Sequence, residues 1–385
     1  MYEYQQLMEL MKAKKISQSG MGRKLGYSST SMCHLIKGGK WPKGRDKNEI
    51  KEAILDELRK AGAEEFELMN LFGPEDGTGE EPTEEKVMLL RKQGLFPEAK
   101  RHFGLVRNPF DEVNSPEDVF LSSDIRYVRE AMYHSARQGG LIAVVGESGS
   151  GKSTLRKDLH ERVRNESKHI HIIEPYVLAM EDNDKKGKSL KSLHIAEAIM
   201  EVIDPTAPLK SSPEARFRQL HTALRESSRA GYAHCLIIEE AHALPIPTIK
   251  HLKRFLELED GFLKLMSIIL LGQSELRYKL SETNPQVREV VQRCEMIELP
   301  DMSGSLPEYV KFRFDRIGKD ATSIITAEAM EALRDRLTGP APRSGSKESV
   351  SLVYPLAVGN LLTAAMNLAA NIGAPSITPE IIKQV

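Results

Sequence analysis

The residues best suited to chemistry form one glycine-rich stretch, GESGSGKST, which follows the apolar run LIAVV. The stretch fits the pattern G-x-x-x-x-G-K-[ST], in which backbone N–H groups surround the phosphates of a nucleoside triphosphate. Its three glycines let the backbone approach the phosphates, and a helix that begins at Lys152 adds the positive end of its dipole. We expect Lys152 to contact the β- and γ-phosphates of ATP and Ser153 to hold Mg²⁺. The candidate nucleotide-binding residues are Gly146, Glu147, Ser148, Gly149, Ser150, Gly151, Lys152, Ser153 and Thr154.

A pair of acids ends a second apolar run, in CLIIEEAHAL. We expect Glu239 to hold the Mg²⁺ shell and Glu240 to orient and polarise the attacking water. Phosphoryl transfer depends on positioning and charge compensation, so both carboxylates are needed near the γ-phosphate. The alternative is that the two acids simply flank a strand.

Three further residues are candidates for the catalytic machinery. Gln273 ends the run LMSIILLGQ, where its side chain would lie between the two acids and the γ-phosphate, unless it only begins a turn. Arg288 and Arg293 precede the last apolar run. We favour Arg293 as a residue that reaches the nucleotide of a neighbouring subunit and stabilises transition-state charge. The alternative for either arginine is a surface salt bridge.

Short apolar runs must form the strands that carry these residues. We predict strands at LIAVV, HIHIIEP, CLIIEE, LMSIILLG and CEMIELP, which are residues 141–145, 169–175, 235–240, 265–272 and 294–300. Helical segments separate them, and this alternation predicts an α/β fold with a parallel sheet. Residues 301–385 are predicted to be helical, with a mobile loop at 339–349.

The first 72 residues predict an all-α domain. Ser17 is a good N-cap for a helix that Gly26 ends, and a further helix follows from about Ser28 to Lys37. This pattern is typical of a helix-turn-helix, although a protein-binding helical bundle is the alternative. Residues 73–85, GPEDGTGEEPTEE, predict an acidic flexible linker. Residues 86–300 then form the nucleotide-binding core, with a helical adaptor up to about residue 102, and residues 301–385 form a helical domain.

The charge of the chain is divided, although its 385 residues carry a net charge of only −1. Residues 11–45 contain nine basic and no acidic residues, whereas residues 61–85 contain nine acidic and no basic residues. A basic head beside an acidic linker favours a nucleic-acid-binding module. The widely spaced Cys33, Cys235 and Cys294 fit no metal pattern and favour a reducing compartment. We find no signal peptide and no apolar run near the ~18 residues of a membrane span, so we expect a cytoplasmic protein with no membrane partner.

The motifs taken together resemble those of an AAA+ ATPase. The resemblance rests on FGLVRNPFDEVNSPEDVFLSS, GESGSGKST, IIEEAHAL, ILLGQSEL, VVQRCEMIEL and EYVKFRFDRIG, and it spans about residues 103 to 385. It is strongest to the group that contains the ExeA-type ATPases and the transposition ATPases of the phage Mu B and TnsC type. The helical domain ahead of the core favours the transposition branch.

This resemblance implies an AAA+ P-loop core with a helical lid at residues 301–385. It also implies an ATP- and Mg²⁺-dependent oligomer, a filament or ring on double-stranded DNA, that delivers target DNA to a DDE-type transposase in a bacterial or phage-infected cytoplasm. The alternative is an ExeA-like regulator or secretion-assembly ATPase that binds proteins. The sequence departs from the family in two places: Glu239 stands where Asp is commoner, and Leu356 stands where the lid usually carries a second-sensor arginine.

Two surfaces are candidates for DNA contact. The helix-turn-helix would present polar and basic side chains to DNA, and in the related transposition ATPases a loop after the second strand tracks the DNA backbone. Acids in that loop favour the alternative that it is merely solvated. The candidate residues are Ser29, Thr30, Ser31, His34, Lys37 and Lys40 on the first surface and Lys185, Lys186, Lys188 and Lys191 on the second.

Overall fold

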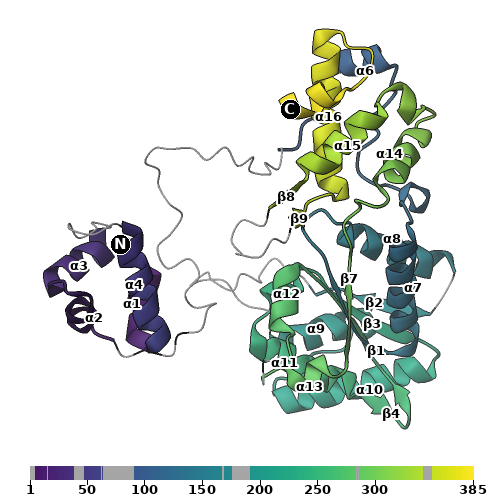
Figure 1. Ribbon diagram of the computed structural model, residues 1–385. Coiled ribbons are helices and arrows are strands. Elements are labelled where there is room, and N and C mark those ends of the chain that lie inside the picture. The colour runs from purple at the N-terminus through teal and green to yellow at the C-terminus, as the bar shows by residue number, and fades with distance from the viewer. Residues whose placement is uncertain are drawn as a thin grey trace. The chain divides into compact units, whose positions relative to one another are not determined.

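The computed structural model describes two separate units, each with its own hydrophobic core (Figure 1). The described residues are 5–14, 16–38, 47–61, 63, 91–166, 169–175, 191–282, 284, 286–340 and 349–385. The two units are Met1–Glu84 and Glu85–Val385. The predicted linker at residues 73–85 lies outside the described residues.

The smaller unit is built from helices α1 (Gln5–Ala13), α2 (Gln18–Leu25), α3 (Ser29–Gly38) and α4 (Lys47–Lys60). Ser17 caps α2, because its Oγ accepts the N–H of Gly20 at 3.0 Å. Gly26 ends α2 with φ +78°, in the left-handed region that favours glycine. Ten buried side chains form the core: Leu7, Leu10, Met11, Met21, Leu25, Met32, Leu35, Ile50, Ile54 and Leu58. The helix, glycine turn and helix predicted around Gly26 are therefore present.

The larger unit contains a five-stranded parallel sheet in the order β2-β3-β6-β1-β7. The strands are β1 (Gly140–Val145), β2 (Ile170–Ile173), β3 (Ala233–Ile238), β6 (Ser267–Gly272) and β7 (Cys294–Glu298). All five predicted strands are present, and the predicted α/β fold is confirmed. Val145 pairs with both Gly272 and Glu298, so β1, β6 and β7 end at the same edge of the sheet.

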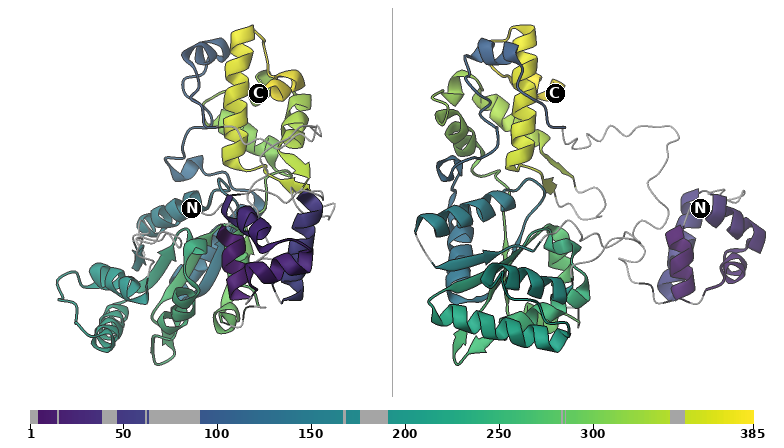
Figure 2. Two further views of the ribbon diagram at one scale, coloured as in Figure 1. Left: turned by 90° about the vertical axis from the view of Figure 1, so that its left-hand side faces the viewer. Right: turned by 180° about the vertical axis from the view of Figure 1, so that it is seen from behind.

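Helices cover both faces of this sheet (Figure 2). One face packs against α7 (Ser123–Gln138) and α8 (Lys152–Asn165), and the other against α9 (Ser192–Ile203), α10 (Pro213–Arg229) and α11 (Ile246–Leu256). Alternate strand residues point to opposite faces, and both sets are apolar and buried. This double burial explains why the strands read as continuous apolar runs.

Smaller elements complete the fold around the sheet. The helical turns are η1 (Pro116–Asp118), η2 (Ala241–Ala243), α12 (Ser274–Lys279) and α13 (Arg288–Val291). Two hairpins pair β4 (Glu259–Asp260) with β5 (Leu263–Lys264) and β8 (Thr338–Pro340) with β9 (Ser349–Ser351). The loop predicted at residues 339–349 thus begins and ends in paired strands, and its residues 341–348 lie outside the described residues.

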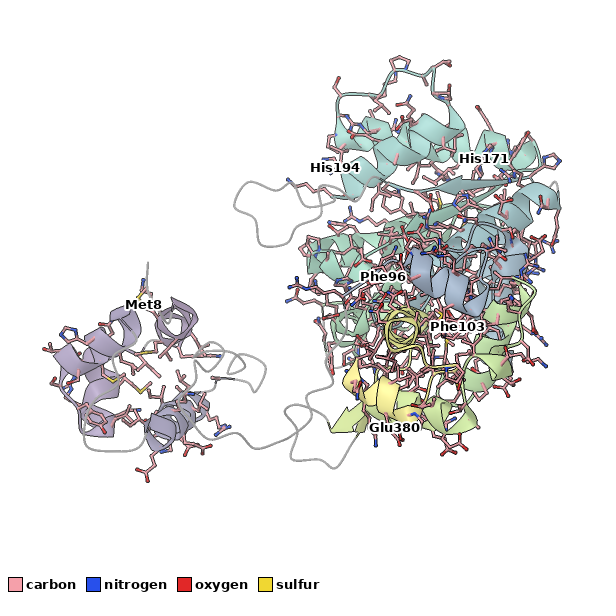
Figure 3. The ribbon with its side chains drawn as sticks, turned by 90° about the horizontal axis from the view of Figure 1, so that it is seen from above. Met8, Phe96, Phe103, His171, His194 and Glu380 are labelled. Carbon is pink, nitrogen blue, oxygen red and sulfur yellow. The ribbon has the colours of Figure 1, made fainter. Side chains whose placement is uncertain are left out.

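The C-terminal residues form a second core within the larger unit. It contains α14 (Leu306–Asp315), η3 (Ala321–Ser323), α15 (Ala327–Arg336), α16 (Pro355–Ile372) and α17 (Pro379–Gln384). Helix α6 (Pro97–Phe103) belongs to the same core, and Figure 3 shows Phe96 and Phe103 beside α16. Asn367 fixes this contact, because it accepts the N–H of Phe96 at 2.9 Å and donates to Gly94 O at 3.0 Å. The predicted adaptor helix is present only from Pro97 among the described residues.

Helix α16 is long and apolar enough to cross a membrane by length and composition alone. Its 18 residues have a mean hydropathy of 1.2. This helix corrects our expectation that no apolar segment of the sequence approaches the length of a membrane span. However, more than half of the helix is buried against the other C-terminal helices. Its apolar composition is therefore explained by packing in a protein core.

Candidate functional site

The glycine-rich loop connects β1 to α8, and its backbone explains its glycines. Gly149 has φ +78° and Gly151 has φ +102°, both in the left-handed region where other residues are strained. At Gly146, a Cβ atom would lie 2.7 Å from Ser150 Oγ and 3.0 Å from Leu299 Cβ. The loop therefore turns tightly between the sheet and the start of α8, as the motif predicts.

Lys152 lies folded inside this loop. Its Nζ donates hydrogen bonds to Gly146 O at 2.7 Å and to Glu147 O at 2.9 Å, and the residue is only 8% exposed. Burial lowers the pKa of Lys152, while nearby carboxylates, Glu240 first, act in the opposite direction. Ser150 Oγ is also buried and has no hydrogen-bond partner among the described residues. A phosphate group would provide hydrogen-bond acceptors for the Ser150 hydroxyl and for the buried ammonium group of Lys152.

Glu240 and Gln273 meet at the same edge of the sheet, as predicted from the sequence. Gln273 Nε2 donates to Glu240 Oε2 at 3.5 Å, and His242 Nδ1 lies 3.6 Å from the same oxygen. Glu240 has φ +48°, and among the described residues it is the one non-glycine with positive φ. Backbone strain of this kind persists where the surroundings enforce it and is frequent at active sites. His242 is not among the residues predicted from the sequence, although its place in the EEAH stretch is a signal for it.

Glu239 forms an ion pair with a residue of α8. Its Oε1 lies 3.2 Å from Nε of Arg156, a residue of α8 one turn after the loop. Nη1 of Arg156 also donates to Glu174 Oε1 at 2.8 Å, just beyond the end of β2. Ser153 is exposed at the start of α8. The two expected Mg²⁺ ligands are thus both present at the edge of the sheet, with Glu239 held in an ion pair.

Most of the residues predicted to bind or hydrolyse the nucleotide line one cavity of about 700 Å³. Its wall includes most of the loop and α8 start, together with Glu240 and Gln273. The opposite wall comes from residues 92–113, α14 and α16. The sequence-predicted residues that line it are Ser148, Gly149, Gly151, Lys152, Ser153, Thr154, Glu240 and Gln273. A cavity of this size accommodates a nucleotide-sized ligand.

Arg313 and Leu356 shape the second wall of this cavity. Arg313 is buried, and its guanidinium donates to the backbone carbonyls of Pro109 (at 2.7 Å) and Asp111. Leu356 packs so tightly on the loop that a Cβ at Gly149 would lie 2.4 Å from Leu356 Cβ. An apolar side chain therefore stands on the loop where the family resemblance leads one to expect an arginine. Arg313 is not among the residues predicted from the sequence.

The two candidate arginines before β7 lie away from this cavity. Arg293 directly precedes β7, whose first residue, Cys294, pairs with Leu141 near the start of β1. It is therefore at the opposite edge of the parallel sheet from the loop, and its Nη1 lies 3.1 Å from Glu257 Oε1. Arg288 begins α13. Within one chain Arg293 makes a salt bridge, and a role toward a nucleotide requires a second subunit.

The candidate DNA-contacting residues are described only in part. On α3, Thr30 and His34 are exposed, and Ser31 is half-buried with its Oγ 2.9 Å from Ser28 Oγ. Lys191 is exposed at the start of α9. The side chains of Ser29 and Lys37, and the whole of Lys40, Lys185, Lys186 and Lys188, lie outside the described residues.

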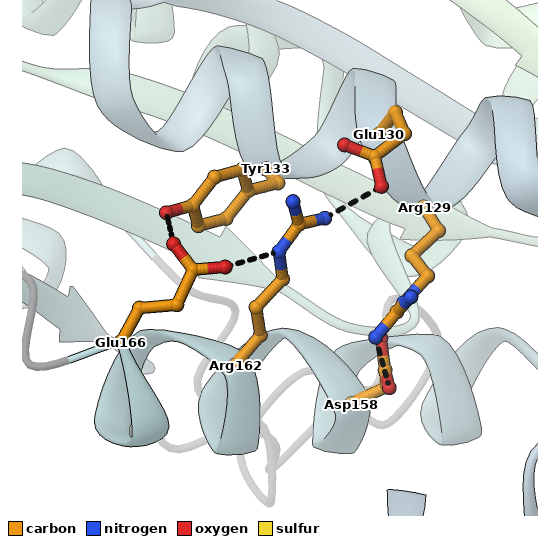
Figure 4. A network of polar contacts seen from close by, with 6 residues as sticks. All are labelled: Arg129, Glu130, Tyr133, Asp158, Arg162 and Glu166. Carbon is orange, nitrogen blue, oxygen red and sulfur yellow. Dashed lines mark hydrogen bonds and ion pairs between the residues drawn. The ribbon is translucent and has the colours of Figure 1, made fainter.

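A polar network fixes α8, and with it the loop, against α7 (Figure 4). Asp158, which is buried in α8, accepts two hydrogen bonds from Arg129 of α7, at 2.5 and 3.2 Å. Arg162 pairs with Glu130 and Glu166 and stacks 3.8 Å from the centre of the Tyr133 ring. Tyr133 in turn donates to Glu166.

Replacing Arg129 by Met should destabilise the larger unit by about 3 kcal/mol, because it leaves a buried carboxylate unpaired. Urea unfolding of the full chain measures this loss. The control is Arg164→Met on the same helix, whose ion pair with Glu161 is exposed and should contribute no more than about 1 kcal/mol. Equal effects of the two substitutions would contradict the structural role of the Arg129–Asp158 pair.

Part of this chain is similar to known proteins. A family model described as "AAA domain" matches residues 135–280, which include β1, the loop, the acid pair and Gln273. The chain is 25% identical over 244 residues to general secretion pathway protein A of Aeromonas hydrophila, which covers 63% of this chain and 42% of that protein. The chain thus matches less than half the length of this curated relative.

Two solved structures are similar to parts of this chain. Cdc6p of Pyrobaculum aerophilum has a TM-score of 0.49 and 14% identity, covering 73% of this chain and 70% of that chain. The Drosophila ORC bound to DNA has a TM-score of 0.48 and 13% identity, covering 80% and 69%. Similarities of this size carry no information on substrate or partner. The matched residues 135–280 contain the loop, Glu240 and Gln273, so the part of the chain that holds the candidate site is similar to the model for an AAA domain.

Proposed function

We propose that this protein is an ATPase that binds ATP with Mg²⁺ in the 700 Å³ cavity and hydrolyses it. The observation that carries the proposal is the meeting of Lys152, Glu240 and Gln273 around one cavity, from three different strand ends. In phosphoryl transfer the protein contributes positioning and charge compensation rather than covalent chemistry. Binding of a fluorescent ATP analogue by the full chain with Mg²⁺ tests the first half of this proposal.

Each residue has a defined task in this reaction. The loop N–H groups and Lys152 hold the β- and γ-phosphates, and Ser153 and Glu239 are the residues that would hold Mg²⁺. Bound Mg²⁺ supplies charge neutralisation on the phosphate oxygens. Glu240 orients and polarises the attacking water, and Gln273 fixes the Glu240 carboxylate through the hydrogen bond from its Nε2. Arg293 of a neighbouring subunit is proposed to stabilise the transition state, which makes hydrolysis dependent on oligomerisation.

We further propose that ATP-bound subunits assemble on double-stranded DNA and deliver it to a DDE-type transposase. The basic, acid-free N-terminal stretch and the helix-turn-helix pattern around Gly26 support a DNA-binding role. The resemblance to transposition ATPases supports the transposase as partner. The second candidate is an ExeA-like regulator that binds proteins, and the similarity to general secretion pathway protein A favours it.

If α3 contacts DNA, negative charges on its exposed face should weaken binding. The double substitution Thr30→Glu and His34→Glu in the full chain should reduce affinity for random duplex DNA at least tenfold, because it repels the phosphates. The control, Arg59→Gln with Lys60→Gln on α4, changes the charge equally but away from α3 and should leave affinity within about threefold. Fluorescence anisotropy across a salt series measures both. A flat salt response, or equal losses in both variants, would contradict phosphate contact through α3.

A further inference from the structure

Arg156 joins two carboxylates that follow neighbouring strands. Glu174 comes just after β2 and Glu239 directly after β3, and these strands pair in parallel with Ile173 opposite Leu236. Arg156 extends from α8 between them, with Nη1 2.8 Å from Glu174 and Nε 3.2 Å from Glu239. One guanidinium therefore connects the loop helix, the end of β2 and an expected Mg²⁺ ligand.

The two contacts of Arg156 differ in quality. The contact with Glu174 is a hydrogen bond, whereas Nε finds no aligned hydrogen-bond partner among the described residues despite its proximity to Glu239. His160 Nε2 also lies 3.0 Å from Glu174 Oε1. Although burial acts to raise it, hydrogen bonds from His160 and Arg156 lower the pKa of Glu174. Arg156 is therefore bound more strongly by Glu174 than by Glu239, and its contact with Glu239 is the easier one to break.

The surroundings give Arg156 room to move. A second cavity, of about 270 Å³, is lined by Arg156, His160 and Glu174, and it shares Thr154 and Lys157 with the nucleotide cavity. The side chains of Arg156 and Glu239 are 21% and 30% exposed, although the Nε atom that faces Glu239 is itself buried. A pair in this environment contributes modestly and can be exchanged for a stronger partner.

We propose that Arg156 is a positioning residue that competes with Mg²⁺ for the carboxylate of Glu239. When Glu239 binds the metal, Arg156 stays bound to Glu174. This inference rests on the proposed nucleotide site. The Arg156–Glu239 pair raises the Mg²⁺ concentration needed for the metal-bound state of the site. Any change at the end of β2 that weakens Glu174 as a partner makes Arg156 more available to Glu239 and raises that concentration further.

The test measures binding of a fluorescent ADP analogue at varied free Mg²⁺, so no hydrolysis step enters the readout. In Arg156→Gln the half-saturating Mg²⁺ concentration should fall about three- to fivefold, the range expected for loss of a partly exposed ion pair. Arg156→Lys keeps the charge but lacks the fork that spans two carboxylates, so its value should also fall. Arg164→Gln, the same charge change on the same helix, should leave the value unchanged. A wild-type value in Arg156→Lys would show that only net charge matters and would overturn the proposal.

A double-mutant cycle with Glu174→Gln distinguishes the proposed competition from a general field effect. In the otherwise unchanged protein, Glu174→Gln should raise the half-saturating Mg²⁺ concentration about twofold or more. In the Arg156→Gln background, Glu174→Gln should not change the half-saturating Mg²⁺ concentration, because no arginine remains that could pair with Glu239 instead of Glu174. Equal shifts in both backgrounds would refute the proposal. If the unchanged protein binds no nucleotide at any Mg²⁺ concentration, the proposed ATP site itself fails; if it binds with Mg²⁺ but the variants behave alike, only the Arg156 inference fails.

Discussion

Glu240→Gln is expected to bind ATP normally and to hydrolyse it about 10²–10³ times more slowly, within the range that a positioned general base contributes. The amide keeps the size of the side chain and its contacts with Gln273 and His242, but it cannot polarise the attacking water. ATP should therefore remain bound, and assemblies that require ATP should persist. Single-turnover hydrolysis combined with nucleotide binding measures both parts of this prediction.

The matched control is Glu275→Gln, which removes an exposed carboxylate two residues after Gln273. Glu275 adds to the electrostatic field at Lys152 but does not line the cavity. Its substitution should leave the hydrolysis rate within about threefold, since exposed charges have small effects. Normal turnover in Glu240→Gln would contradict the role assigned to this residue.

Lys152→Ala should weaken nucleotide binding about 10- to 100-fold, because it removes charge-assisted hydrogen bonds to the phosphates. The loss should be smaller for AMP, whose single phosphate does not reach the β- and γ-positions. Lys152 also bonds the loop carbonyls of Gly146 and Glu147, so a small loss of stability should accompany the loss of affinity. Calorimetric titration with ADP and AMP separates these effects.

Lys250→Ala on α11 is the control, since this lysine is exposed and lies outside the cavity wall. It should bind ADP as the unchanged protein does. If Lys152→Ala bound ADP within threefold of the unchanged protein, the assignment of the loop as the phosphate site would be wrong. A thermal unfolding curve for each variant shows whether loss of binding reflects loss of folding.

Much of the sheet and the phosphate loop could be predicted because their signals are local. Strands buried on both faces are continuous apolar runs, and the loop is one short motif with glycines at fixed places. Glu240 and Gln273 follow buried strands, and parallel strands bring their carboxyl ends to one edge of the sheet. Their meeting could therefore be predicted from their positions in the chain.

The second wall of the cavity could not be predicted in this way. Arg313 is bonded to Pro109 and Asp111 across more than 200 residues of chain, and Asn367 is bonded to Gly94 and Phe96 across more than 270. Contacts between such distant segments leave no local pattern. The ion pair between Arg156 and Glu239 was missed for the same reason, since a basic residue on an amphipathic helix looks like an ordinary surface residue.

Target-DNA delivery is tested most directly by co-sedimentation of the full chain with random double-stranded DNA in the presence of ATP, ADP or no nucleotide, with electron imaging of the pellet. We expect assembly on DNA with ATP, and much less assembly with ADP or without nucleotide. Glu240→Gln should retain DNA with ATP for longer than the unchanged protein. A protein that binds ATP but stays off DNA in all three states would contradict target-DNA delivery and would favour a protein partner.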